Sequence, residues 1–166
     1  MISAELKAKA GKIKLVVTDI DGVWTDAKMY YNAEGEVMKA FSTYDGMATY
    51  LLNKVGIPTA MISGEDSPSV AARAKKLKLD DVFLGIKDKL IVFETLLEKY
   101  DLTPDQVAYI GDDVNDYIVM QVAGLTASPA STPAFHILKP DILLDRVGGD
   151  GAFREFADLI IAAQDK

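Results

Sequence analysis

The sequence predicts an α/β protein with a doubly wound, Rossmann-like parallel sheet, and two observations support this prediction. Short apolar runs alternate with longer segments of helical character along the whole chain. Several of these runs are continuously apolar, which is typical of strands buried on both faces of a parallel sheet. Strands that alternate with helices in this way indicate repeated β-α-β units.

The expected elements follow from these runs and from the helix start signals between them. We expect strands at residues 14–18, 58–63, 81–84, 107–111, 125–127 and 142–144. We expect helices at residues 44–55, 68–78, 87–100, 114–123 and 151–163. Ser67 followed by Pro68 is a favourable helix start, with serine as the cap and proline in the first turn.

Residues 28–41 interrupt this alternation. Tyrosine and methionine lie on both sides of an Asn-Ala-Glu-Gly turn at 32–35, which predicts a β-hairpin. The hairpin would project from the end of the first strand. The segment is too short for a second domain, so we expect one domain over residues 1–166.

Composition excludes several classes of protein. The chain has 166 residues, of which 49% are hydrophobic and 26% charged, a globular balance. Its net charge of -7 argues against a nucleic-acid partner, because the phosphate backbone requires a basic surface. It has no cysteine, which excludes disulfides and zinc-thiolate sites. The first fourteen residues lack a signal-peptide apolar stretch, and no run approaches about 18 apolar residues, so we expect a cytoplasmic protein without a membrane span.

Polar side chains follow four of the predicted strands, at the edge where ligands bind in open α/β sheets. These residues are Asp19 and Asp21 after the first strand, Ser63 and Glu65 after the second, Lys89 after the third, and Asp112, Asp113 and Asp116 after the fourth. Converging carboxylates repel one another strongly unless a cation lies between them. The pattern therefore predicts a Mg²⁺ site, since Mg²⁺ prefers oxygen ligands and substrate phosphates.

Such a site would support phosphoryl transfer. Asp19 could bind the metal with one oxygen and attack phosphorus with the other. Asp21 could protonate the leaving oxygen and later activate water. Lys89 would neutralise phosphoryl charge, and Ser63 would donate a hydrogen bond to it.

Simpler interpretations remain open for each residue type. Asp19 and Asp21 could belong to a solvated turn, and the later aspartates could be a charge cluster at a helix N-terminus. Lys87 competes with Lys89 for the phosphate-binding role. Ser63 could cap a turn.

The motifs TDIDGVWTD, MISGE, KDKL and YIGDDVND occur in this order and resemble the four motifs of the haloacid dehalogenase superfamily of phosphatases. The resemblance covers almost the whole chain. It implies that Asp19 is the nucleophile and Asp21 the general acid/base. It also implies that Asp19, the main-chain carbonyl of Asp21 and Asp112 hold Mg²⁺, with Asp113 and Asp116 as supporting residues.

Many members of this superfamily carry a cap domain, and this chain has no room for one. It resembles a capless subgroup in which hairpins pair between subunits of a homotetramer and a neighbouring subunit covers the active site. The resemblance therefore implies a homotetramer built through residues 28–41. The C-terminal segment Gly-Gly-Asp-Gly-Ala-Phe-Arg-Glu also resembles this subgroup.

The resemblance implies a small-molecule substrate, a phosphorylated 2-keto-3-deoxy sugar acid. Glu65 stands where enzymes for the eight-carbon octulosonate usually have arginine. Arg73 and Lys76 lie three residues apart on one helix face, where they could hold a sugar-acid carboxylate or form a solvated basic face. This combination more closely resembles the branch acting on 2-keto-3-deoxy-D-glycero-D-galacto-nononate 9-phosphate, with 3-deoxy-D-manno-octulosonate 8-phosphate as the alternative.

Three other classes compete with a phosphatase. A receiver domain also has a doubly wound sheet and acidic residues, but its phosphorylated aspartate follows a later strand than the one before Asp19. A non-catalytic scaffold would not need both Asp19 and Asp21. A phosphomutase would need closure around its substrate, which the missing cap disfavours.

Overall fold

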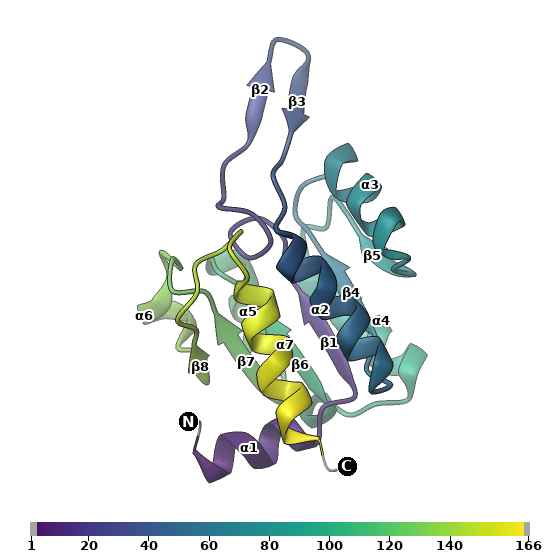
Figure 1. The fold of residues 1–166 in the computed structure, drawn as a ribbon, viewed down its shortest axis with the longest axis vertical. Coiled ribbons are helices and arrows are strands. Elements are labelled where there is room, and N and C mark those ends of the chain that lie inside the picture. The colour runs from purple at the N-terminus through teal and green to yellow at the C-terminus, as the bar shows by residue number, and fades with distance from the viewer. Residues whose placement is uncertain (1–2, 165–166) are drawn as a thin grey trace.

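The computed structural model describes residues 3–164 and confirms the predicted fold class (Figure 1). Six parallel strands form one sheet in the order β5-β4-β1-β6-β7-β8. These strands are β1 (Leu15–Thr18), β4 (Thr59–Ile62), β5 (Asp81–Phe83), β6 (Val107–Ile110), β7 (Leu125–Ser128) and β8 (Ile142–Leu143). A separate antiparallel hairpin consists of β2 (Tyr30–Asn32) and β3 (Gly35–Met38).

Helices cover both faces of the sheet. They are α1 (Ala4–Gly11), α2 (Thr43–Lys54), α3 (Pro68–Leu77), α4 (Lys89–Tyr100), α5 (Tyr117–Met120), α6 (Phe135–Leu138) and α7 (Ala152–Ala163). Two short 3₁₀ helices, η1 (Pro104–Gln106) and η2 (Val114–Asp116), precede β6 and α5. None of the helices in the described range has the length and hydropathy needed to cross a membrane.

Alternate residues of each central strand enter two different cores. Val16 packs in the core beneath α1, α2, α3 and α7, while Leu15 and Val17 pack in the core beneath α4, α5 and α6. Ala108 and Tyr109 of β6 divide between the same two cores. Both faces are therefore buried, which explains why the strands are continuously apolar in sequence.

The strand order reverses direction between β1 and β6. From β1 the chain continues outward through β4 and β5, and it then returns to β6 on the other side of β1 and continues through β7 and β8. Ligands bind at such a switch point, outside the carboxyl ends of the strands. The residues that follow β1 and β6 therefore mark the expected site.

The hairpin projects away from the sheet, as the sequence predicted (Figure 1). It carries a group of exposed apolar side chains, namely Met29, Tyr30, Tyr31, Val37 and Met38. Its base returns toward the sheet at Lys39, whose side chain is buried. The projecting part of the hairpin is thus apolar and exposed. Its base at Lys39, called the hairpin root below, is charged and buried.

Three helical segments differ from the prediction. Helix α1 was not predicted because its alternating alanine and lysine residues carry no clear apolar face; Ser3 caps it by accepting the Leu6 N–H. Helix α6 was also not predicted. The helix predicted at 114–123 is instead a 3₁₀ turn followed by a single α-helical turn, because the Asp113 carboxylate binds the Val114 N–H and tightens the start.

Candidate active site

The nucleophile candidate lies at the switch point. Asp19 directly follows β1, and its N–H donates to the Ile110 carbonyl at the end of β6, at 2.9 Å. Its side chain is buried, with 4% of the residue exposed. The backbone is thus fixed by the sheet, and the carboxylate can point only toward the carboxyl ends of the strands.

Lys89 joins two of the buried carboxylates. Its Nζ lies 2.5 Å from Oδ1 of Asp19 and 2.7 Å from Oδ1 of Asp116. Lys89 is the first residue of α4, and Asp88 caps that helix by accepting the Leu90 N–H. Burial alone would lower the pKa of Lys89, but Asp19 and Asp116 outweigh it and raise the pKa above its ordinary value. Lys87, the competitor in the sequence, is exposed.

Asp116 is fully engaged within the protein. Its Oδ1 also accepts the Tyr109 hydroxyl at 2.6 Å, and its Oδ2 accepts the N–H groups of Asp112 and Asp113 at 2.9 and 3.3 Å. These bonds leave Asp116 as a structural anchor that fixes Lys89 and the loop after β6. Asp116 is therefore a poor candidate for direct metal ligation.

Asp19 and Asp112 both have raised pKa values. Burial, and then the charges of Asp116 and Asp113, together raise the pKa of Asp112 to about 7. Burial and then Asp116 also raise the pKa of Asp19 well above its usual range, although Lys89 opposes the rise. One ammonium does not compensate the three buried carboxylates, so the cluster favours an added cation.

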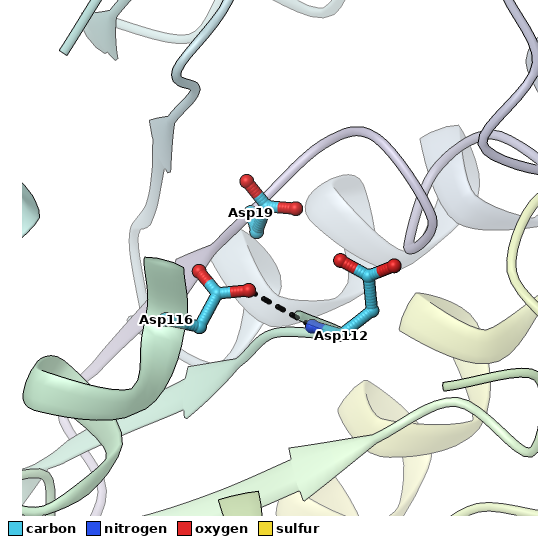
Figure 2. A group of neighbouring side chains, drawn as sticks. All are labelled: Asp19, Asp112 and Asp116. Carbon is cyan, nitrogen blue, oxygen red and sulfur yellow. Dashed lines mark hydrogen bonds between the residues drawn. The ribbon is translucent and has the colours of Figure 1, made fainter. Parts of the chain in front are cut away.

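The donor set fits a hard divalent cation. One carboxylate oxygen from each of Asp19, Asp112 and Asp116 lies within 4.8 Å of the others, and Figure 2 shows the three side chains around one space. Asp116 also holds the main-chain N–H of Asp112, as the dashed line in Figure 2 shows. An all-carboxylate set suits Mg²⁺. Because Asp116 is engaged elsewhere, Asp19 and Asp112 are the available side-chain ligands.

Two glycines make this close approach possible. A Cβ on Gly22 would meet Oδ2 of Asp112 at 1.8 Å, and Gly22 has a φ of +88°. A Cβ on Gly111 would meet Cγ of Asp116 at 2.4 Å. The glycines in the motifs Asp-x-Asp-Gly and Gly-Asp-Asp-x-x-Asp are therefore required by the packing of the acidic residues.

Asp21 lies on the same cleft but has a different partner. Lys39 Nζ is 2.6 Å from Oδ1 of Asp21 and 2.9 Å from Oδ2. The sequence analysis did not identify Lys39. No local motif marks it, because its contact with Asp21 depends on how the hairpin returns to the sheet.

The remaining polar residues from β4 line the cleft or lie beside it. Ser63 is buried and its Oγ accepts the Glu65 N–H at 3.2 Å, so it fixes the loop after β4. Glu65 is exposed and lines a cleft of about 190 Å³. The other lining residues are Asp19, Asp21, Ala27, Met29, Gly64, Asp112, Asp113 and Asn115.

Two predicted substrate-binding residues lie elsewhere within the single chain. Arg73 packs between α3 and α2, where its guanidinium donates to the Ser42 carbonyl at 3.3 Å and lies 6.0 Å from the Phe41 ring. Lys76 lines a different cleft, together with Pro58 and Thr59 at the start of β4. The structure therefore brings Glu65 to the acidic cleft of the same chain but does not bring Arg73 or Lys76 there.

Together, the fold and this cleft define a class of protein: a doubly wound hydrolase with an acidic cleft at the carboxyl ends of its strands. A family model for the haloacid dehalogenase-like hydrolases matches residues 30–124. The chain belongs to the haloacid dehalogenase-like hydrolase family. This confirms the resemblance drawn from the four motifs.

The relatives place the chain among the phosphatases of this family. The 3-deoxy-D-manno-octulosonate 8-phosphate phosphatase KdsC of Escherichia coli strain BL21-DE3 is 38% identical over 165 residues, covering 99% of this chain and 88% of the relative. The crystal structure of 3-deoxy-D-manno-octulosonate 8-phosphate phosphatase from Yersinia pestis has a TM-score of 0.95 at 36% identity, covering 99% of this chain and 89% of that one. The phosphatase of the same name from Moraxella catarrhalis, in complex with magnesium ion, phosphate ion and a KDO molecule, has a TM-score of 0.92 at 36% identity, covering 98% and 94%.

Proposed function

We propose that this protein hydrolyses the phosphomonoester of a phosphorylated 3-deoxy sugar acid, with Mg²⁺ as cofactor. The observation that carries the proposal is the position of Asp19. One of its oxygens binds Lys89, and its carboxylate opens on a cleft that also contains Asp21, Glu65 and Asp112. A nucleophile, an acid/base and a cation site thus face the same space.

The reaction proceeds in two steps on these residues. A carboxylate oxygen of Asp19 attacks phosphorus, the bond to the sugar oxygen breaks, and Asp21 gives that oxygen its proton. Asp21 then takes a proton from water as the water oxygen attacks the phosphorus of the aspartyl phosphate. The bond to Asp19 breaks, which releases phosphate and restores the free carboxylate.

Other residues of the chain stabilise the charge that these steps develop. Lys89 places an ammonium beside the Asp19 carboxylate and holds it in one orientation. Ser63 accepts the Glu65 N–H through its hydroxyl oxygen, and we assign its hydroxyl hydrogen to a hydrogen bond with the phosphoryl group. When bound by Asp19, Asp112 and the Asp21 main-chain carbonyl, Mg²⁺ supplies the positive charge that draws the phosphate to an acidic cleft.

The relatives favour an eight-carbon substrate. Several relatives at 36 to 38% identity are named as 3-deoxy-D-manno-octulosonate 8-phosphate phosphatases. We therefore take 3-deoxy-D-manno-octulosonate 8-phosphate as the first candidate, in place of the nine-carbon substrate that the sequence motifs favoured. One observation keeps 2-keto-3-deoxy-D-glycero-D-galacto-nononate 9-phosphate as the second candidate: Glu65 lines the cleft, where it can accept hydrogen bonds from sugar hydroxyls.

A substrate comparison tests this assignment. Phosphate release with Mg²⁺ is measured for the two sugar-acid phosphates, and kcat/KM is compared between them. A higher kcat/KM for the octulosonate phosphate supports the first candidate, and a higher value for the nononate phosphate supports the second. Activity on an aryl phosphate but on neither sugar acid would overturn the substrate assignment and leave the phosphatase chemistry in place.

We also propose a homotetramer assembled through the hairpin. The exposed apolar side chains of β2 and β3 support it, since a projecting two-stranded hairpin gains little stability alone. Assembly would also bring Arg73 and Lys76 near the acidic cleft of a neighbouring subunit. Sedimentation equilibrium of the wild type and of a Tyr31→Lys, Val37→Lys variant tests it. A tetramer that the double variant dissociates is the expected result, and a wild-type monomer contradicts the proposal.

A further inference from the structure

We propose that Lys39 is a positioning residue that aims the carboxylate of Asp21 at the leaving-group side of the cleft. This inference rests on the proposed role of Asp21 as general acid/base. Lys39 Nζ donates to both carboxylate oxygens of Asp21, at 2.6 and 2.9 Å. Because one ammonium contacts both oxygens, Lys39 fixes the position of the Asp21 carboxylate relative to the base of the hairpin.

Burial distinguishes this pair from an ordinary surface ion pair. The Lys39 side chain is 0% exposed, whereas that of Asp21 is 21% exposed. A buried ammonium cannot leave its carboxylate partner without a large desolvation penalty. Lys39 therefore approaches Asp21 from the protein side, and the face of Asp21 that stays accessible is the one that lines the cleft.

A second carboxylate holds Lys39 itself in place. Glu36 of β3 lies 3.6 Å from Lys39 Nζ, and the Ser67 hydroxyl donates to Glu36 at 2.6 Å. Ser67 is also the N-cap of α3. A chain of contacts thus joins the loop after β1, the hairpin root and α3. It runs from Asp21 through Lys39 and Glu36 to Ser67. The hairpin thus takes part in orienting the acid/base.

The alternative is that Lys39 only fastens the hairpin to the sheet. The two roles differ in their dependence on the leaving group. Expulsion of an alkoxide requires protonation by Asp21, whereas expulsion of 4-nitrophenolate requires little help. A misaimed Asp21 therefore slows an alkyl phosphate more than an aryl phosphate, while a loosened fold slows both equally. The parameter to compare is kcat/KM, because it reports the first phosphoryl transfer.

The experiment compares Lys39→Met, Lys39→Arg and Asp21→Asn on glycerol phosphate and on 4-nitrophenyl phosphate. Lys28→Met is the matched control, because Lys28 lies on the same hairpin but is exposed. We expect Lys39→Met to lose about 100-fold more kcat/KM on the alkyl than on the aryl phosphate. Lys39→Arg should recover most of this loss, and Lys28→Met should change neither substrate.

A double variant removes the ambiguity that misfolding would create. Lys39→Met combined with Asp21→Asn removes both charges of the ion pair and leaves Glu36 bound to the Ser67 hydroxyl. The double variant should have the same alkyl phosphate kcat/KM as Asp21→Asn alone. A further loss in the double variant, or equal losses on both substrates for Lys39→Met, would overturn the inference. If Asp21→Asn itself shows no leaving-group dependence, then the proposed role of Asp21 fails and the inference fails with it. A wild type that cleaves neither these phosphates nor either sugar-acid phosphate would overturn the proposed function.

Discussion

Two lysines hold the two aspartates of one motif, and they do so from different parts of the molecule. Lys89 belongs to α4, and it binds Asp19 and Asp116 in the buried centre of the sheet edge. Lys39 belongs to the hairpin root, and it binds Asp21 from the side where the chain leaves the sheet. Both ammonium groups are buried, but only Lys89 is held entirely by the doubly wound sheet and its helices.

This difference separates the two halves of the proposed reaction. The part of the site around Asp19, the proposed nucleophile, is built from the ends of β1 and β6 and from the start of α4, so its geometry follows from the core of the fold. The leaving-group side is built from an insertion, so its geometry can change without disturbing the core. We infer that phosphoryl chemistry is fixed by the sheet and that the response to the leaving group is fixed by the hairpin.

The largest expected effect comes from the nucleophile side. Asp19→Asn removes the attacking oxygen, and we expect kcat to fall by at least about 10³-fold on alkyl and aryl phosphates alike. The melting temperature of the metal-free protein should not fall much, because the raised pKa of Asp19 shows that its charge is costly in the folded state. Phosphate release and a thermal melt check the two expectations. Activity retained on either substrate would contradict the assignment of the nucleophile.

Removing Lys89 tests whether the two lysines affect different steps of the reaction. Lys89→Met leaves Asp19 and Asp116 without their cation, and we expect it to destabilise the protein by about 3–5 kcal/mol. Its kcat/KM should fall by a similar factor for alkyl and aryl phosphates, because Lys89 does not contact the acid/base. Urea unfolding and the ratio of the two kcat/KM values measure these effects. If Lys89→Met changes the ratio of alkyl to aryl kcat/KM as Lys39→Met does, then the surroundings of Asp19 and Asp21 do not act separately.

The separation also explains which parts of the site could be predicted from the sequence. The sheet was predictable because each strand is a local apolar run, and the acidic cluster was predictable because parallel strands end at one edge. The choice between Lys87 and Lys89 required the structure, since it depends on where Asp88 caps α4. Lys39 was missed because its contact with Asp21 spans a hairpin whose return path no local pattern specifies.

The helix face that carries Arg73 shows a second limit of prediction from the sequence. A spacing of three residues correctly places Arg73 and Lys76 near one another on α3, but it does not specify what that face meets. In the structure the guanidinium of Arg73 packs beside Gly46 of α2, where a Cβ would approach its Nη2 at 2.5 Å. The packing between helices decides this direction, and it is a non-local property.

The acidic cluster should make stability depend on pH and on metal. The pKa of Asp112 is raised from 3.8 to about 7, so its folded form keeps a proton that the unfolded chain has already released. In the metal-free protein the free energy of unfolding should therefore fall between about pH 4 and pH 7, and Asp112→Asn should reduce this slope. Mg²⁺ at about 100 times its Kd should add roughly 3 kcal/mol, with the larger gain at the higher pH. Denaturant unfolding at several pH values checks this, and a slope that rises instead would exclude a protonated Asp112.

The smallest expected effect concerns the sugar acid. Glu65 lines the cleft of its own chain, so Glu65→Ala should lower the kcat/KM for the preferred sugar-acid phosphate relative to an aryl phosphate by about 10-fold. Arg73→Ala and Lys76→Ala should change this ratio only if a neighbouring subunit brings these residues to the cleft, because neither lines it within one chain. The ratio is measured for each of the three variants, above and below the concentration at which the assembly dissociates. These measurements distinguish recognition by the same chain from recognition by a neighbouring subunit. If Arg73→Ala changes the ratio of the two kcat/KM values only in the assembled form, part of substrate recognition belongs to the neighbouring chain. Equal losses on both substrates for Glu65→Ala would remove Glu65 from substrate recognition.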